Sequence, residues 1–200
     1  MTDEKKEPST HESDSKKTPI KRAKPVAKRA IAKEKKEEKP LPPSPKQSLL
    51  ENYVQKITKK VGKDAIEESY INRAGEHVPT LVVKKDAWFQ VASFLKNGLH
   101  FVYIQNYSGV DYQTHMEVVC HLYSFVRKER IAIRVKADRE RPTFPSLASL
   151  YPAANWNERE MYDLLGIHFE GHPNLTRILL PDNWEGHPLR KDYVPLDKEV

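Results

Sequence analysis

Cysteine is nearly absent from this sequence of 200 residues, in which Cys120 is the only one. A single thiol cannot close a disulfide within the chain. It also cannot supply the set of cysteine ligands that holds a typical iron–sulfur cluster or structural zinc ion. The composition therefore excludes a disulfide-stapled domain and a cysteine-held metal centre within this chain, and it fits a reducing, intracellular compartment.

Long apolar runs are missing as well. No stretch reaches the roughly 18 apolar residues that predict a membrane-spanning helix, so we expect none. The sequence opens MTDEKKEPST, which is charged and lacks the apolar segment of a secretory signal peptide.

The net charge of +6 is confined to one part of the chain. Residues 1–47 hold 14 Lys and Arg against 8 Asp and Glu, whereas the remaining residues hold 20 of each. Residues 1–46 also lack glycine and aromatic side chains, while they carry 7 of the 15 prolines. Because such a segment buries too little apolar surface to offset the entropy of ordering, we predict a disordered tail over 1–46. A solubilising spacer is the expected role, and contact with anionic lipid or RNA through charge alone is the alternative.

Hydrophobic periodicity predicts an α+β fold after the tail, with a mostly antiparallel or mixed sheet covered by helices on one face. The expected helices cover residues 48–61 and 86–97, and the expected strands cover 65–73, 79–85, 99–112, 114–125 and 130–137. In the strand over 114–125, Cys120 and Leu122 point to one face, whereas Glu117 and His121 point to the other. The short charged link before 130–137 predicts an antiparallel hairpin.

Four residues are expected to mark the ends of these two helices. Ser48 and Asp86 stand where N-caps are needed, and Ser48 precedes Glu51 at the spacing of a capping box. Gly62 and Gly98 are the expected stops.

The chain changes character after residue 141. The pattern predicts a short helix at 145–150 and a better one that starts near Asn157 and stops at Gly166. On the second helix, Met161, Leu164 and Leu165 are expected to face one way, with Glu158, Arg159, Glu160 and Asp163 on the polar face. We therefore divide the chain into a tail at 1–46, an α+β domain at 47–140, and a helix with an extended partner-binding arm at 141–200.

Two nearly identical sequence motifs, FEGHP at 169–173 and WEGHP at 184–188, are candidates for a metal or acid/base site. A stand-alone hydrolase would use the pairs Glu170/His172 and Glu185/His187. However, the residue before a proline is driven towards extended conformations, and the preceding glycine permits positive φ. The Gly-His-Pro motif is therefore more typical of a turn than of a metal or acid/base site. We expect neither catalytic nor metal-binding residues in this chain.

The end of the chain, RILLPDNWEGHPLRKDYVPL, is rich in Arg, Trp, Tyr and Pro and has no periodicity of its own. Arg, Trp and Tyr anchor protein interfaces, and proline lowers the entropy that an extended arm loses on docking. This composition indicates an arm that binds a permanent partner.

The string from Glu158 to Tyr193 closely resembles the signature of the C subunit of proton-translocating NADH:quinone oxidoreductase, respiratory complex I. Its chloroplast and cyanobacterial counterpart is called the J subunit. The matching positions are Glu158, Arg159, Glu160, Asp163, Leu164, Leu165, His172, Ile178, Leu179, Trp184, Gly186, Pro188, Leu189, Arg190, Asp192 and Tyr193. Thr176 departs from the pattern, since a basic residue is usual there.

The resemblance implies an accessory, non-catalytic subunit in the peripheral arm of a translocase that couples electron transport to proton transport. It implies the D subunit, which helps to form the quinone site, as the main partner. The B subunit and other peripheral-arm subunits are implied as further neighbours, with contact to the membrane only through the complex. FMN, iron–sulfur clusters and quinone would belong to the parent complex and none of them to this chain. The implied location is peripheral, at the cytoplasmic face of a bacterial cell membrane, and no nucleic acid is expected as a partner. The partner-contact candidates are Glu158, Arg159, Glu160, Asp163, His172, Arg177, Trp184, His187, Arg190, Asp192 and Tyr193.

Overall fold

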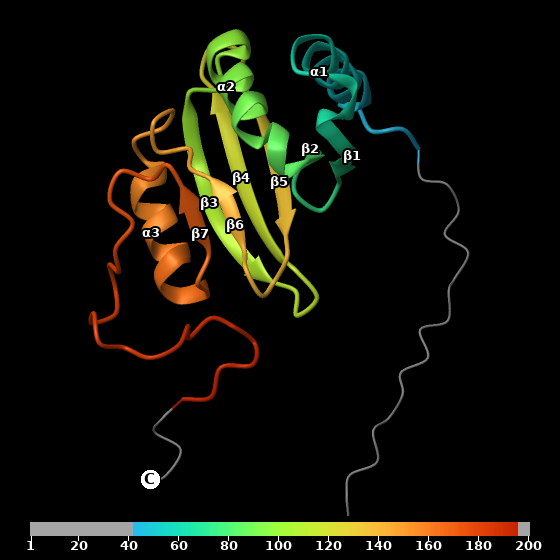
Figure 1. The fold of residues 1–200 in the computed structure, drawn as a ribbon. Coiled ribbons are helices and arrows are strands. Elements are labelled where there is room, and N and C mark those ends of the chain that lie inside the picture. The colour runs from blue at the N-terminus through green and yellow to red at the C-terminus, as the bar shows by residue number, and fades with distance from the viewer. Residues whose placement is uncertain (1–41, 196–200) are drawn as a thin grey trace, which may run out of the picture. The chain divides into compact units, whose positions relative to one another are not determined.

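The computed structural model describes residues 42–195 (Figure 1), so most of the predicted tail lies outside the described residues. Helices are α1 (Gln47–Lys60), α2 (Trp88–Leu99) and α3 (Ala154–Leu165), with short 3-10 turns η1 (Lys63–Ala65) and η2 (Lys85–Ala87). Strands are β1 (Ile66–Asn72), β2 (Val78–Val83), β3 (Tyr103–Asp111), β4 (Met116–Ser124), β5 (Glu129–Ala137), β6 (Thr143–Pro145) and β7 (His168–Glu170).

Five strands form the main sheet in the order β1-β2-β5-β4-β3. Neighbours pair antiparallel except β2 and β5, which run parallel because the chain crosses over through α2, β3 and β4 between them. The predicted hairpin is present, with Cys120 opposite Ile133 across β4 and β5. Strands β6 and β7 make a separate parallel pair centred on Phe144 and Phe169. The predicted mixed sheet and α+β class are confirmed.

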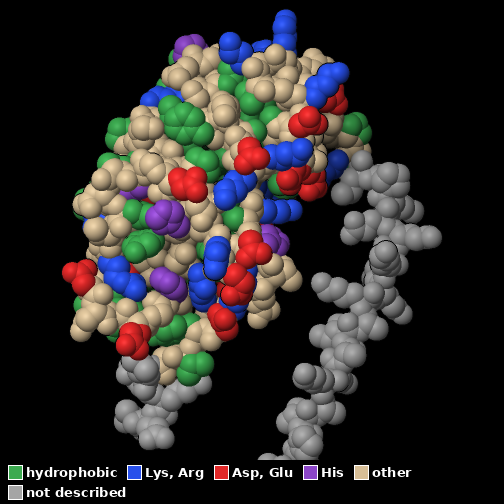
Figure 2. Space-filling view, in the orientation of Figure 1, with side chains coloured by type: hydrophobic (Ala, Val, Ile, Leu, Met, Phe, Trp, Pro, Cys, Tyr) green, Lys and Arg blue, Asp and Glu red, His purple; other side chains and the backbone are tan. Residues whose placement is uncertain are grey.

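One face of the main sheet carries the core, as the alternation in β4 predicts. Val118, Cys120 and Leu122 are fully buried there against side chains from all three helices, including Tyr53, Trp88 and Met161. The opposite face is mainly polar. On it Arg134 of β5 pairs with Glu117 of β4 and bonds the Tyr70 hydroxyl at 2.5 Å. Charged side chains of both signs are also interspersed on the face shown in Figure 2.

The predicted helix ends are only partly correct. Helix α1 begins at Gln47 without a side-chain cap, and the Ser44 hydroxyl, not Ser48, accepts a hydrogen bond from the Lys46 amide at 3.2 Å. Asp86 is also not a cap, because it lies inside η2 and α2 starts two residues later. Gly98 is helical, and the left-handed residue that ends α2 is His100, with φ of 61°. Backbone packing therefore sets these ends more than side-chain capping does.

The secondary structure predicted after residue 141 is also partly wrong. No helix forms at 145–150, because Phe144 of β6 pairs with β7 and the following Ser146 amide bonds the Glu170 carbonyl at 2.8 Å. Helix α3 begins three residues before the predicted Asn157 but ends as predicted, with Gly166 left-handed at φ of 70°. Residues from both sides of the expected division at 140/141, such as Leu122 and Phe144, belong to the same core.

Candidate functional site: the carboxyl-terminal arm on helix α3

Residues 171–195, which we call the arm, turn back onto the chain's own helix α3. In Figure 1 the arm leaves β7, runs alongside α3 and curls beneath it. The Leu189 amide donates to the Leu164 carbonyl at 3.0 Å, and Arg190 Nε donates to the Leu165 carbonyl at 2.7 Å. The irregular end predicted from the sequence is thus held by contacts within the chain, at the end of α3 where carbonyls lack helical partners.

Asp163 is the main anchor of the arm. Its Oδ2 accepts hydrogen bonds from three successive arm amides, those of Ile178, Leu179 and Leu180, at 3.0, 2.8 and 2.9 Å. Its Oδ1 lies 2.6 Å from Arg177 Nη1, and its side chain is completely buried. Burial alone would raise the pKa of this carboxyl, but the three amides and Arg177 outweigh burial and lower the pKa to about 2. Asp163 is therefore not on the polar face predicted for it.

Two arginines complete this anchor. Arg159 donates to the carbonyls of Thr176 and Arg177 at 3.1 and 2.9 Å. Arg177 in turn donates to the Trp184 carbonyl at 3.1 Å. Both guanidinium groups thus tie arm carbonyls to α3, which leaves them fewer donors for a partner molecule.

A second anchor holds the far end of the arm. Arg139 bonds Asp111 through two nitrogens, each at 2.9 Å, and also reaches Asp192 at 2.6 Å. The Lys191 amide donates to Asp111 at 3.0 Å. Hydrogen bonds from Arg139 are the largest cause of the lowered pKa of Asp111, so this carboxylate stays ionised in the fold.

The two Gly-His-Pro motifs form turns, as predicted. Gly171 and Gly186 have φ of 78° and 87°. His172 lies 3.2 Å from the Asn155 carbonyl through Nε2, and His187 lies 3.0 Å from the Asp163 carbonyl through Nδ1. Each of these nitrogens must carry the hydrogen, because a carbonyl only accepts. Both histidines position the arm.

The glutamates that precede these histidines in the two motifs form no catalytic pair with them. Glu170 and Glu185 are exposed, and within residues 42–195 no ion pair links either one to its neighbouring histidine. The same residues contain no group of three His, Cys, Asp or Glu side chains that could hold a metal ion. The geometry required by the hydrolase alternative is therefore not formed by the described part of the chain.

Close packing of the arm leads to a prediction at Gly166. A Cβ there would lie 2.6 Å from His187 Nε2 and 2.8 Å from Arg190 Nη2, whereas a Cβ at Gly171 would meet nothing within 4 Å. Both glycines are left-handed, so alanine at either position should cost about 1–2 kcal/mol of backbone strain. Gly166→Ala should cost roughly a further 1–3 kcal/mol, because His187 and Arg190 must move. Urea unfolding of the two variants measures the difference; equal losses would mean that the arm does not pack tightly at Gly166.

Glu158 is a buried carboxyl, and its predicted place on the polar face is wrong. It is inaccessible to water, and Ser146 Oγ donates to it at 2.5 Å, the Leu147 amide at 2.7 Å and the Tyr107 hydroxyl at 3.2 Å. Burial raises the pKa of Glu158 to about 7, and the three donors oppose that rise. A signal was present in the sequence, because residues 158, 161 and 165 follow the helical spacing of a single face.

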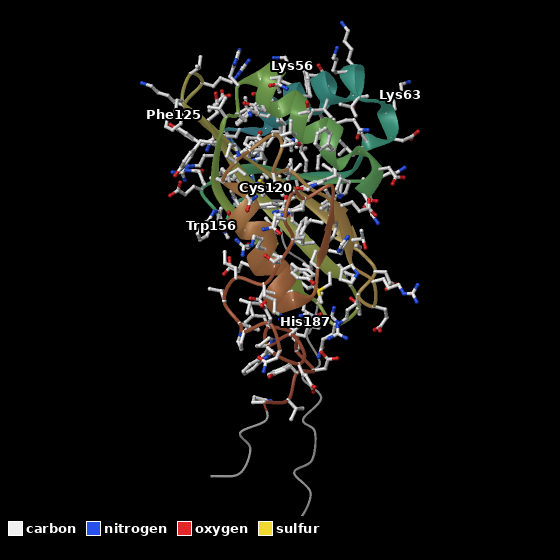
Figure 3. All side chains as sticks on the ribbon, turned by 60° about the vertical axis from the view of Figure 1, so that its left-hand side comes forward. Lys56, Lys63, Cys120, Phe125, Trp156 and His187 are labelled. Carbon is white, nitrogen blue, oxygen red and sulfur yellow. The ribbon has the colours of Figure 1, made fainter. Side chains whose placement is uncertain are left out.

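Most of the predicted contact residues thus have partners within the chain. These are Glu158, Arg159, Asp163, His172, Arg177, His187, Arg190 and Asp192. Tyr193 is half-buried beside Gly186, the Trp184 backbone is held by Arg177, and Glu160 is exposed. Four exposed apolar residues are absent from the predicted contact residues: Trp156 on α3, which is 67% exposed, and Leu179, Leu189 and Val194 on the arm, which are 58–62% exposed. Figure 3 shows Trp156 at the outer side of the molecule and Cys120 within it.

None of the helices formed by residues 42–195 is long and apolar enough to cross a membrane.

Comparison with known proteins matches this fold and this arm together. Residues 81–199 match the family model described as respiratory-chain NADH dehydrogenase, 30 Kd subunit. The C subunit of the NADH-quinone oxidoreductase of Roseiflexus sp. (strain RS-1) is 47% identical over 125 residues, which cover 60% of this chain and 71% of that relative. The C subunit of the same enzyme from Moorella thermoacetica is 45% identical over 123 residues, which cover 60% of this chain and 83% of that relative.

Solved structures agree. The trypsin-resistant fragment (1-134) of Nqo5 superposes with a TM-score of 0.51 at 28% identity, covering 64% of this chain and 97% of the fragment. A chain of an archaeal membrane-bound sulfane sulfur reductase has the same fold, with a TM-score of 0.60 at 24% identity over 73% of this chain and 86% of that chain. The match to the family model runs from the middle of β2 through the arm and covers more than half of the chain, and this chain therefore belongs to the family of the respiratory-chain NADH dehydrogenase 30 kDa subunit.

Proposed function

We propose that this chain is the non-catalytic C subunit of a proton-translocating NADH:quinone oxidoreductase, and that its arm binds the D subunit, which helps to form the quinone site. The observation that carries the proposal is that the arm has a fixed backbone and exposed apolar side chains. Its backbone is fixed to α3 by Asp163, Arg159 and Arg190, while the large apolar side chains of Leu179, Leu189 and Val194 remain about 60% exposed. Apolar side chains displayed on a rigid backbone are typical of a surface that a permanent partner covers.

A non-catalytic role is consistent with how the polar groups of the arm are used. Three ionisable side chains of α3 and the arm, Asp163, His187 and Arg190, bond the arm to α3. The single cysteine, Cys120, is buried in the core and cannot supply a cluster with its ligands. We therefore assign FMN, the iron–sulfur clusters and the quinone to other subunits of the complex.

The remaining assignments follow from the same proposal. The chain sits in the peripheral arm at the cytoplasmic face of a bacterial cell membrane, with the B subunit as a further neighbour. It reaches the membrane only through the complex, which carries out electron transport and proton translocation. No nucleic acid takes part.

The test is co-purification of the D subunit with the tagged full-length chain from membranes. Leu189→Asp combined with Val194→Asp should lower the yield of the D subunit at least about tenfold, because two uncompensated charges would have to be buried. The matched control is Val126→Asp, since Val126 is 80% exposed on the turn between β4 and β5. Loss of the D subunit from the control and not from the arm variant would place the binding surface elsewhere and overturn the proposal.

A further inference from the structure

A shallow groove of about 240 Å³ lies between α3 and the arm. Its lining on the helix side is Trp156, Asn157 and Glu160, and its lining on the arm side is Ile178 and Leu179. Residues 156 and 160 are one helical turn apart, so both face the groove from α3. The indole of Trp156 and the side chain of Leu179 are its most exposed apolar parts.

The groove is rigid because Arg159 and Asp163, the two α3 side chains of the first anchor, hold the arm directly beside it. Arg159 holds the carbonyls of residues 176 and 177, and Asp163 holds the amides of residues 178, 179 and 180. Five hydrogen bonds from two α3 side chains therefore fix the arm wall against the helix wall. A preformed wall spares a ligand the entropy of ordering it, so the exposed side chains are already placed for binding.

The chemistry of the groove specifies what it would hold. Glu160 is exposed and has no ion-pair partner among residues 42–195. An open indole face attracts a cation, and a carboxylate one helical turn away adds a charge-assisted hydrogen bond to the same cation. Ile178 and Leu179 offer the apolar surface for an aliphatic side chain next to it. The volume suits one or two side chains and not a cofactor.

We propose that this groove receives a segment of a neighbouring subunit in which a Lys or Arg stands beside an aliphatic side chain. This inference rests on the proposed function and names the chemistry of one contact. The groove lies within residues 81–199, the region that matches the family model, whereas the chain's own basic tail lies outside it. A partner subunit is for that reason a better occupant than the tail.

A photo-crosslinking amino acid identifies the occupant. The full-length chain carrying Trp156→p-benzoylphenylalanine is expressed in cells that assemble the complex and is irradiated in intact membranes. The cross-linked peptide should come from another subunit and contain a Lys or Arg within a few residues of an aliphatic side chain. Cross-links to residues 1–41, to a second copy of this chain, or to an acidic segment would each overturn the proposal.

Charge reversal supplies an independent readout. Glu160→Lys should lower the yield of the cross-link and the co-purification of the cross-linked subunit about tenfold, and Glu160→Gln should lower them only about threefold. Glu68→Lys is the control and should leave both unchanged, because Glu68 is exposed on β1, at the edge of the sheet opposite β3, the strand that packs against α3. Unchanged yields with Glu160→Lys would overturn the role of this carboxylate.

The two proposals fail in different ways. If the Leu189/Val194 variant loses the D subunit while Glu160→Lys and the cross-link show no basic occupant, the arm binds its partner and the groove inference is wrong. If the cross-link finds a basic segment of some other subunit while the Leu189/Val194 variant retains the D subunit, the groove inference holds and the proposed partner is wrong.

Discussion

Replacing Asp163 by alanine should release the arm and lower the free energy of unfolding by about 3–5 kcal/mol, the range for breaking a buried ion pair. The substitution leaves Arg177, whose side chain is only 18% exposed, without its carboxylate. It also removes the acceptor shared by the amides of residues 178, 179 and 180. Urea unfolding followed by circular dichroism gives the loss in free energy, and limited proteolysis gives the release of the arm.

Asp182→Ala is the matched control, because Asp182 is an exposed aspartate on the same arm. It should change the free energy of unfolding by less than about 0.5 kcal/mol and leave the proteolysis pattern unchanged. If Asp163→Ala were cleaved no faster than this control, the arm would be held mainly by its far anchor at Arg139. Because folding lowers the pKa of Asp163 to about 2, its contribution is complete above the ordinary aspartate range and is lost as pH falls towards 2.

Replacing Glu158 by glutamine should remove a pH dependence of stability. Folding raises the pKa of Glu158 from 4.5 to about 7, so the folded chain binds a proton more tightly than the unfolded chain does. The parent protein should therefore lose roughly 3 kcal/mol of stability as pH rises from 4.5 to 7, and no more above that. Glutamine stays neutral and can still accept from Leu147 and Tyr107 through its oxygen, so its profile should be flatter over that window and higher at pH 8.

Urea unfolding at pH 5, 6, 7 and 8 tests this expectation, with Glu160→Gln on the exposed face of the same helix as the control. The control should keep the slope of the parent protein. A parent profile parallel to that of Glu158→Gln would show that Glu158 is ionised at little cost in the fold. Glu158→Ala should be destabilised by about 2–4 kcal/mol at every pH, because it leaves a cavity and buried donors without an acceptor.

The features that the sequence predicted well depend on neighbours along the chain. The alternating faces of β4, the hairpin between β4 and β5, and the stop of α3 at Gly166 are all local patterns, and the structure has them. The helix expected at 145–150 is wrong for a non-local reason. Phe144 of β6 pairs with Phe169 of β7, and the hydrogen bond from the Ser146 amide to the Glu170 carbonyl continues this extended pairing to residue 146.

The polar residues of α3 show the same limit at the candidate site. Acidic side chains on a helix normally face water, and Glu160 does. Glu158 and Asp163 face inward because their hydrogen-bond partners, Tyr107 and Arg177, come from β3 and from the arm. The sequence around α3 does not predict contacts with these partners, because the partners belong to other elements of the fold. Composition did indicate that the end of the chain binds something, but it did not show that α3 of the same chain is its first contact.

The second anchor has a consequence for how the protein is made. The Lys191 amide reaches an oxygen of Asp111, 80 residues earlier in the chain. Translation supplies residues in order, so the carboxylates of Asp111 and Asp163 are synthesised before the residues of the arm that bond them. A prematurely terminated polypeptide that ends within α3 would lack one entire wall of the groove. Assembly through that groove would then exclude polypeptides that lack the arm from the complex, without a separate quality-control factor.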